Sequence, residues 1–252
     1  GDGAAAGLAA WLHGMSGEEI STYDYGHING FPQTIAPGTR NNGSIDWYYK
    51  EAPVLFAEVH SDPLDPILQI NHPRSTGSMG GYFNAAGFDP ETGTVSHPET
   101  WDPDFESVEV WNGEDFRARE ADAVLDWFAM LDMGMRFSAM GNSDGHNYLG
   151  SEIGYPRNCF VVGHDDPSAL TDAEVKAAIL AQEVYVSGGI LVTAEGPAGE
   201  GPGGIVDAPG GTADIHVVVQ APTWIAADRL RVFVDGDEVD TITLDASTAD
   251  PG

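Results

Sequence analysis

The sequence predicts an α/β fold with much parallel sheet in its first two thirds, followed by a small all-β module. Apolar, strand-like runs alternate with helix-like segments up to about residue 195. A stretch rich in Gly and Pro occupies 196–211, and the residues after it alternate as strands do. We therefore expect one domain over 1–195, a linker over 196–211 and a β module over 212–252. With 42% hydrophobic residues among 252, the chain can bury a substantial core.

The strands are predicted from short apolar runs bounded by turn residues. In chain order they are expected over 18–24, 26–32, 67–73, 107–112, 135–141, 157–163, 183–189 and 190–196. Residues 74–104 separate two of them and are rich in Gly, Pro, Ser, Thr and Asp, which predicts a long, functional surface loop. Within the β module, "DGD" at 235–237 indicates a hairpin turn.

The helices are predicted from apolar spacing and capping residues. Ser44 or Asp46 is a candidate cap for the first helix, which Pro53 would kink or restart. A second helix is expected over 114–133, with Gly134 at its end. A third is expected over 172–181, where Thr171 and Glu174 have the spacing of a capping box.

The net charge of the chain argues against some classes of binding partner. Forty Asp and Glu residues against ten Lys and Arg give a net charge of -30, which argues against nucleic-acid and anionic-membrane binding. No apolar run approaches the roughly 20 residues that span a bilayer, so no membrane insertion is expected. The acidity favours an extracytoplasmic or high-salt environment. The single cysteine, Cys159, excludes an internal disulfide, and its apolar surroundings predict a buried, inert thiol.

Potential metal ligands collect at the ends of the inferred strands, where function gathers in α/β folds. They are Glu19, His27, His72, Asp144 and His146. Each motif alone has a simpler interpretation, such as a turn histidine in "NHP" or an Asx-turn in "SDGH". Their joint placement in an alternating chain favours a metal site. A mixed imidazole and carboxylate set suits Zn, Mn or Fe, whereas oxygen ligands alone would suggest Ca or Mg.

This order of motifs resembles the PHP (polymerase and histidinol phosphatase) family of metal-dependent hydrolases, and more narrowly its CehA/McbA-type members. The resemblance rests on "GEEIST", "GHINGFP", "INHPR", "VEVWN" and "NSDGH", and covers residue 14 to about 195. The segments "GPGGIV" and "VVVQAPTWI" also resemble the module that follows the catalytic domain in that subgroup. The resemblance implies a distorted (β/α)7 barrel that holds two or three divalent metal ions at its C-terminal rim.

The resemblance also assigns ligand roles, with Glu19 rather than Glu18 as the bridging carboxylate. It implies His27 and His72 at the second metal, Asp144 at the first and His146 at the third. The family's H-x-H strand, and the Asp and His after it, have no counterpart before Glu19, and His13 is no substitute. Either the chain is a fragment of a longer protein, which we expect, or the site is degenerate. We predict at most weak binding of a single metal and little turnover by this chain alone.

The predicted function is hydrolysis of a small phosphoester by a metal-activated water. Cleavage of a carboxylic ester or carbamate is an alternative that the CehA resemblance implies. A non-catalytic binding module built on a degenerate site is another. In an enzyme of this kind, Asp144, His146 and Arg74 are the expected catalytic residues.

Two cations and three polar side chains are candidates for supporting roles. Arg74 and Arg157 are rare cations in an acidic chain, and either bind an anionic substrate or pair with two of the forty acids. Asn112 and Asn142 are expected to orient the ligands. Glu109 alternates with two valines in its strand, so it faces either the site or solvent.

Overall fold

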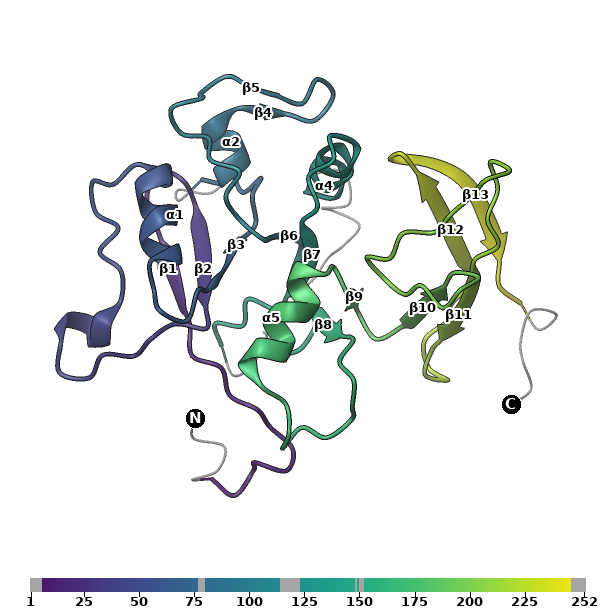
Figure 1. The fold of residues 1–252 in the computed structure, drawn as a ribbon, viewed down its shortest axis with the longest axis horizontal. Coiled ribbons are helices and arrows are strands. Elements are labelled where there is room, and N and C mark those ends of the chain that lie inside the picture. The colour runs from purple at the N-terminus through teal and green to yellow at the C-terminus, as the bar shows by residue number, and fades with distance from the viewer. Residues whose placement is uncertain (1–5, 77–79, 114–122, 148, 150–151, 246–252) are drawn as a thin grey trace.

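A computed structural model of the chain describes residues 6–76, 80–113, 123–147, 149 and 152–245. An α/β part carries the first two thirds of the chain, and a β module follows it (Figure 1). A five-stranded sheet with the order β1-β2-β3-β6-β7 organises the α/β part. Its strands are β1 (Glu18–Ser21), β2 (His27–Phe31), β3 (Ile67–Ile70), β6 (Ser107–Asn112) and β7 (Ser138–Asn142).

The central strand β3 is buried at every position because helices cover both faces of the sheet. On one face, Leu68 and Ile70 join the larger core with the apolar side of α1 (Ala52–His60). On the other, Ile67 packs with Val175 and Ile179 of α5 (Asp172–Leu180). Successive residues of a strand point to opposite faces of the sheet. The polar side chains of the candidate metal centre described below lie on this second face.

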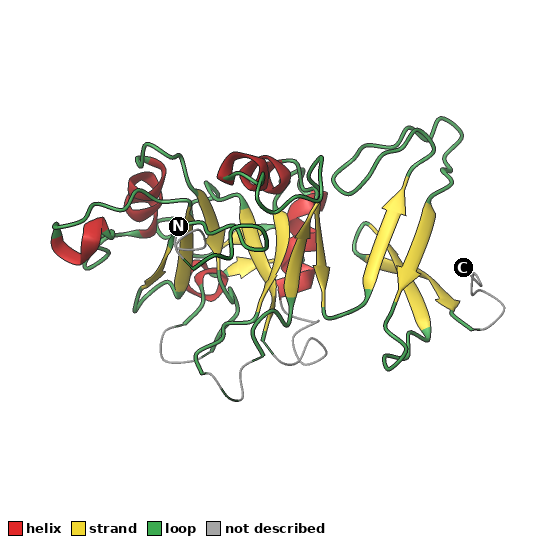
Figure 2. Ribbon diagram, turned by 90° about the horizontal axis from the view of Figure 1, so that it is seen from below, coloured by secondary structure: helices red, strands yellow, loops and turns green. Residues whose placement is uncertain are grey.

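The predicted (β/α)7 barrel is wrong. β1 and β7 form the two edges of the five-stranded sheet, and the other strands in the described part of the chain form two-stranded pieces, so no barrel closes (Figure 2). A parallel barrel needs a crossover after each strand. Here Thr22 bonds to the carbonyl of Gly26 through both its N–H and its hydroxyl, which turns the chain back directly after β1. In the described part of the chain, the parallel pairings of this sheet are β3 with β6 and β6 with β7, whereas β2 is antiparallel to both β1 and β3.

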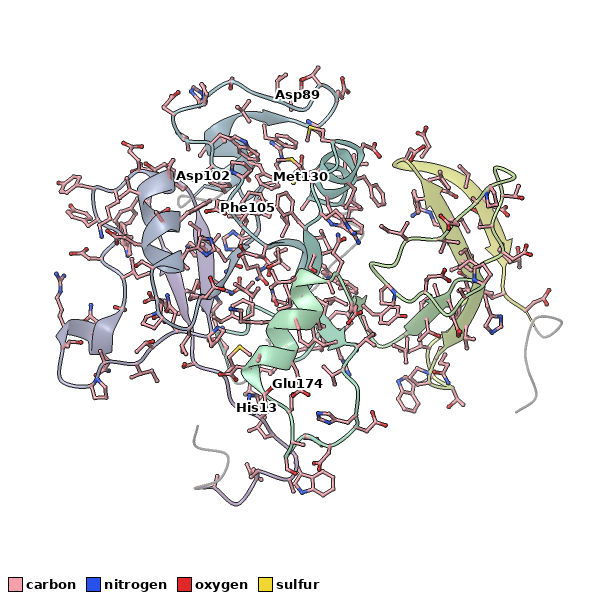
Figure 3. All side chains as sticks on the ribbon, in the orientation of Figure 1. His13, Asp89, Asp102, Phe105, Met130 and Glu174 are labelled. Atoms are coloured by element: carbon pink, nitrogen blue, oxygen red, sulfur yellow. The ribbon has the colours of Figure 1, made fainter. Side chains whose placement is uncertain are left out.

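The predicted loop over 74–104 is also wrong as a description of the whole segment. It contains α2 (Tyr82–Ala86), β4 (Phe88–Asp89) and β5 (Thr94–Val95). Tyr82, Phe83 and Phe88 are almost fully buried and pack around Phe105 in the larger core. Figure 3 labels Phe105 and another member of this core, Met130. A few aromatic side chains therefore order a segment whose overall composition is that of a loop.

The first helix begins later than the sequence predicts. Glu51 precedes α1, and neither Ser44 nor Asp46 caps it. Pro53 lies in the first turn, where a proline has no intrahelical hydrogen bond to lose. The proline therefore starts this helix and does not kink it.

The ends of two other helices confirm the sequence signals. Thr171 and Glu174 form the predicted capping box at the start of α5. After α4 (Ala123–Asp132), Gly134 has the positive φ of 78° that ends many helices. The first half of the helix predicted over 114–133 falls largely on residues 114–122, which lie outside the described residues.

Two antiparallel pairs complete the part before the module. β8 (Arg157–Phe160) pairs with β9 (Val184–Ser187) and packs against β7. The close approach requires Gly141, because a Cβ there would lie 2.5 Å from Val186 Cγ1. Cys159 in β8 is half-buried, not fully buried as predicted. β10 (Leu191–Glu195), predicted within the first domain, pairs with β11 (His216–Gln220).

The module ends in the hairpin of β12 (Arg229–Val234) and β13 (Asp237–Thr243). Asp235 and Gly236 both have positive φ, as the predicted hairpin turn requires. The ring of Phe233 lies 5.5 Å from that of Phe128, which joins the hairpin to α4. None of the described helices has the length and apolarity needed to span a membrane.

Candidate metal centre

Three of the five predicted ligands meet at one edge of the sheet. Glu19 lies within β1, His27 begins β2, and His72 follows β3. Since β2 runs antiparallel to both neighbours, its start lies beside the ends of β1 and β3. His27 Nδ1 is 3.1 Å from Glu19 Oε1 and 3.2 Å from His72 Nε2. The prediction that each ligand lies at or just past the end of a strand holds for His72, whereas His27 is the first residue of β2 and Glu19 lies within β1.

These separations fit a shared divalent cation. Tetrahedral ligands about 2.0 to 2.1 Å from a zinc ion lie about 3.3 Å from one another, close to the two distances in the cluster. The facing nitrogens of His27 and His72 can share only one proton between them. Burial, followed by the nearby His27, lowers the pKa of His72, which favours the neutral imidazole that binds metals.

The outward nitrogens of the two rings have no partner. His27 Nε2 and His72 Nδ1 are buried and have no hydrogen-bond partner among the described residues. With the inward nitrogens on a metal ion, each outward nitrogen would carry the proton of its ring. The donor set of two neutral imidazoles and one carboxylate fits Zn, Mn or Fe.

A buried amide network positions the carboxylate. Asn71 Nδ2 donates to Glu19 Oε1 at 3.0 Å, and Gln69 Nε2 donates to Asn71 Oδ1 at 2.8 Å. Both amides are almost fully buried. Such partners of a ligand fix its orientation. The sequence prediction missed both residues, although two amides at alternate positions of an otherwise apolar strand are a recognisable signal.

Glu109 forms hydrogen bonds with the backbone of one ligand, His72, and with the side chains of Asn112 and Asn142, which were predicted to orient the ligands. It is 2% exposed and accepts hydrogen bonds from His72 N at 2.6 Å, Asn142 Nδ2 at 2.8 Å and Asn112 Nδ2 at 3.2 Å. Burial raises its pKa to about 7. His72 has a φ of 27°, which a non-glycine residue adopts only when its surroundings hold it there. Glu109 thus faces the site, and the asparagines contact it rather than the three ligands.

The remaining predicted ligands form a pair at the open side of the site. Asp144 Oδ1 lies 2.8 Å from His146 Nε2, and Asp144 Oδ2 accepts from Asn112 Nδ2 at 3.2 Å. Asn112 Nδ2 also donates to Glu109, which accepts from His72 N, so Asp144 lies beside the hydrogen bonds that hold His72. The side chain of His146 is 73% exposed. The structure therefore brings together Glu19, His27 and His72, with Asp144 and His146 beside them.

The two predicted substrate-binding arginines lie in different settings. Arg74 donates from Nε and Nη2 to both oxygens of Asp126, at 2.7 and 2.6 Å, and Asp126 is 1% exposed. The guanidinium also lies over the rings of Phe83 and Phe88. Arg74 therefore anchors α4 to the core, the second of its two predicted roles. Arg157 is exposed and donates to the carbonyl of Gly154.

The chain matches no family model, no curated protein and no solved structure. The resemblance to the PHP family therefore rests on the sequence motifs alone. The chemistry of the site has to be inferred from its own residues.

Proposed function

We propose that this chain carries the metal centre of a metal-dependent hydrolase of small esters, with phosphoesters as the first candidate class. The convergence of Glu19 Oε1, His27 Nδ1 and His72 Nε2 carries the proposal. A divalent ion held by these atoms would supply a Lewis acid that polarises an ester oxygen and lowers the pKa of water. Glu19 is itself positioned by Asn71, so the ligand set is preorganised.

The pair of Asp144 and His146 supplies the proton transfer that ester cleavage needs. At 2.8 Å the carboxylate holds one nitrogen of the ring and fixes its tautomer. The exposed ring is free to reach a substrate at the open side of the site. We assign His146 as the group that protonates the leaving oxygen and Asp144 as the residue that positions it.

A groove of about 500 Å³ beside Glu19 offers a place for the substrate. Its lining includes Glu18, Trp47, Tyr48 and Arg40. The side chain of Arg40 is 82% exposed, and its Nη1 lies 3.4 Å from Asp46 Oδ2. It is therefore a cation that can turn toward an anionic ester, a role that the sequence prediction gave to Arg74 and Arg157.

Carboxylic ester or carbamate cleavage is the second candidate. The observation that favours it is the engagement of Arg74 by Asp126, which removes one of the two cations on which the phosphoester prediction rested. A neutral ester needs no cationic partner. The groove's acidic side chains, Glu18 and Glu19, also repel a phosphate dianion unless a cation neutralises them.

A hydrolysis assay separates these candidates. It compares a phosphomonoester, a phosphodiester and an aryl carboxylic ester in the presence of Mn²⁺ or Zn²⁺. We expect phosphoester hydrolysis that is lost in His72→Ala and whose KM rises in Arg40→Gln. The matched control is Arg229→Gln, which removes an exposed arginine of β12 outside the groove and should leave KM unchanged.

Two results of this assay would contradict phosphoester hydrolysis. Cleavage of the carboxylic ester alone, with no effect of Arg40→Gln, would establish the second candidate. Metal binding at His27 and His72 without hydrolysis of any substrate would contradict an enzyme and indicate a binding module.

A further inference from the structure

A second group of potential metal ligands lies at the other end of β6. His60 is the last residue of α1, and Asp104 and Glu106 lie just before β6 begins. The candidate metal centre lies past the opposite end of this strand, where Asn112 contacts Asp144. At about 3.3 Å per residue, Glu106 and Asn112 are about 20 Å apart. The two groups therefore share no ligand.

The three side chains converge without forming a closed hydrogen-bond network. Each offers one ligand atom, and these atoms all lie within 4.8 Å of one another. His60 Nε2 is 3.8 Å from Glu106 Oε1 and 3.1 Å from the backbone carbonyl of Asp104. Glu106 Oε2 accepts from the backbone N–H of Leu68 at 2.7 Å, which fixes the carboxylate against β3. Its second oxygen is left to face the imidazole.

The charge around this group is negative and uncompensated. Among the described residues, neither Asp104 nor Glu106 forms an ion pair with Lys or Arg. The side chains of His60 and Glu106 are only 19% and 20% exposed. Half-buried carboxylates of this kind are stabilised by a nearby cation.

We propose that His60, Asp104 and Glu106 bind a divalent transition-metal ion that ties the end of α1 to the start of β6. One imidazole and two carboxylates form a donor set that suits Zn or Mn better than Ca or Mg. Asp104 is exposed and gives the ion a route from solvent. These three residues were not among the ligands predicted from the sequence, because they come from two segments that share no motif.

The test uses a His27→Ala, His72→Ala chain, in which the candidate metal centre is disabled. Zn²⁺ alone and Mn²⁺ alone are titrated by calorimetry, and the metal content is measured after dialysis. We expect one ion per chain, which is lost in His60→Asn and in Glu106→Gln. The matched control is His97→Asn, since His97 forms a similar 3.5 Å pair with Glu99 at an exposed position. That control should retain the ion.

Failure to bind an ion, or equal binding after His60→Asn, would overturn the proposal and leave His60 as a hydrogen-bond partner of the Asp104 carbonyl. A second measurement follows the ring resonances of the histidines. In the same His27→Ala, His72→Ala chain, paramagnetic Mn²⁺ should broaden the ring resonances of His60. Sharp His60 resonances at saturating Mn²⁺ would also overturn it. Ester hydrolysis should survive His60→Asn, so failure of this proposal is distinguishable from failure of the proposed function.

Discussion

Replacing Asp126 by Asn tests whether Arg74 anchors the core. Both carboxylate oxygens accept from Arg74, at 2.6 and 2.7 Å, and Asp126 is 1% exposed. Removing one partner of a buried ion pair leaves the other charge buried without a partner, and typically lowers the free energy of unfolding by about 3 to 5 kcal/mol. The side chain of Arg74 is 20% exposed, so water compensates part of this cost. We therefore expect Asp126→Asn to lower the free energy of unfolding by about 3 kcal/mol.

Urea unfolding followed by tryptophan fluorescence measures this loss. The matched control is Glu238→Gln, which breaks the 2.9 Å pair with Arg231 at a more exposed position and should lower the free energy of unfolding far less. A loss below about 1 kcal/mol in Asp126→Asn would refute the anchoring role. In that case Arg74 would again be available to a substrate, and the same variant should change KM without changing stability.

Three further predictions concern single side chains. The pKa of Glu109 is about 7 in the fold and near 4.5 in the unfolded chain, so the unfolded state loses this proton first. The stability of the metal-free protein should fall by up to about 3 kcal/mol between pH 4.5 and 7; a Glu109→Gln protein with the same pH slope would contradict this. Thr171→Ala should lower stability by about 1 kcal/mol through loss of the capping box, with Thr171→Ser as the control; an unchanged urea midpoint would contradict it. Asn71→Ala should weaken Zn²⁺ binding at Glu19 by about tenfold or more in calorimetry; an unchanged affinity would contradict it.

Local sequence signals predicted the elements that depend on neighbouring residues. The strand expected over 107–112 is β6, and Thr171 caps α5 as its spacing indicates. The direction in which strands pair is not such a signal. A strand-like run has the same pattern in parallel and antiparallel sheets, so the reversal after β1, made by Thr22 and Gly26, was missed. The barrel prediction failed for this reason.

In the candidate site too, local motifs were predicted from the sequence and contacts between distant residues were not. Glu19, His27 and His72 were found because each stands in a short motif and near a strand end. Contacts between distant residues could not be found in this way. Asp126 lies 52 positions from Arg74, and no local pattern pairs them. Among forty acids, the partner of a given arginine is decided by the packing of α4 against the core.

The central claim is that Glu19, His27 and His72 form a metal centre. The most direct measurement is Zn²⁺ binding in a His60→Asn chain, where the second ligand group is disabled and only this centre remains. Calorimetry and metal analysis should find one ion per chain. That ion should be lost when His72→Ala is added and retained when His146→Ala is added, since the His146 side chain is 73% exposed and lies outside the cluster. Retention of the ion after His72→Ala would contradict the account.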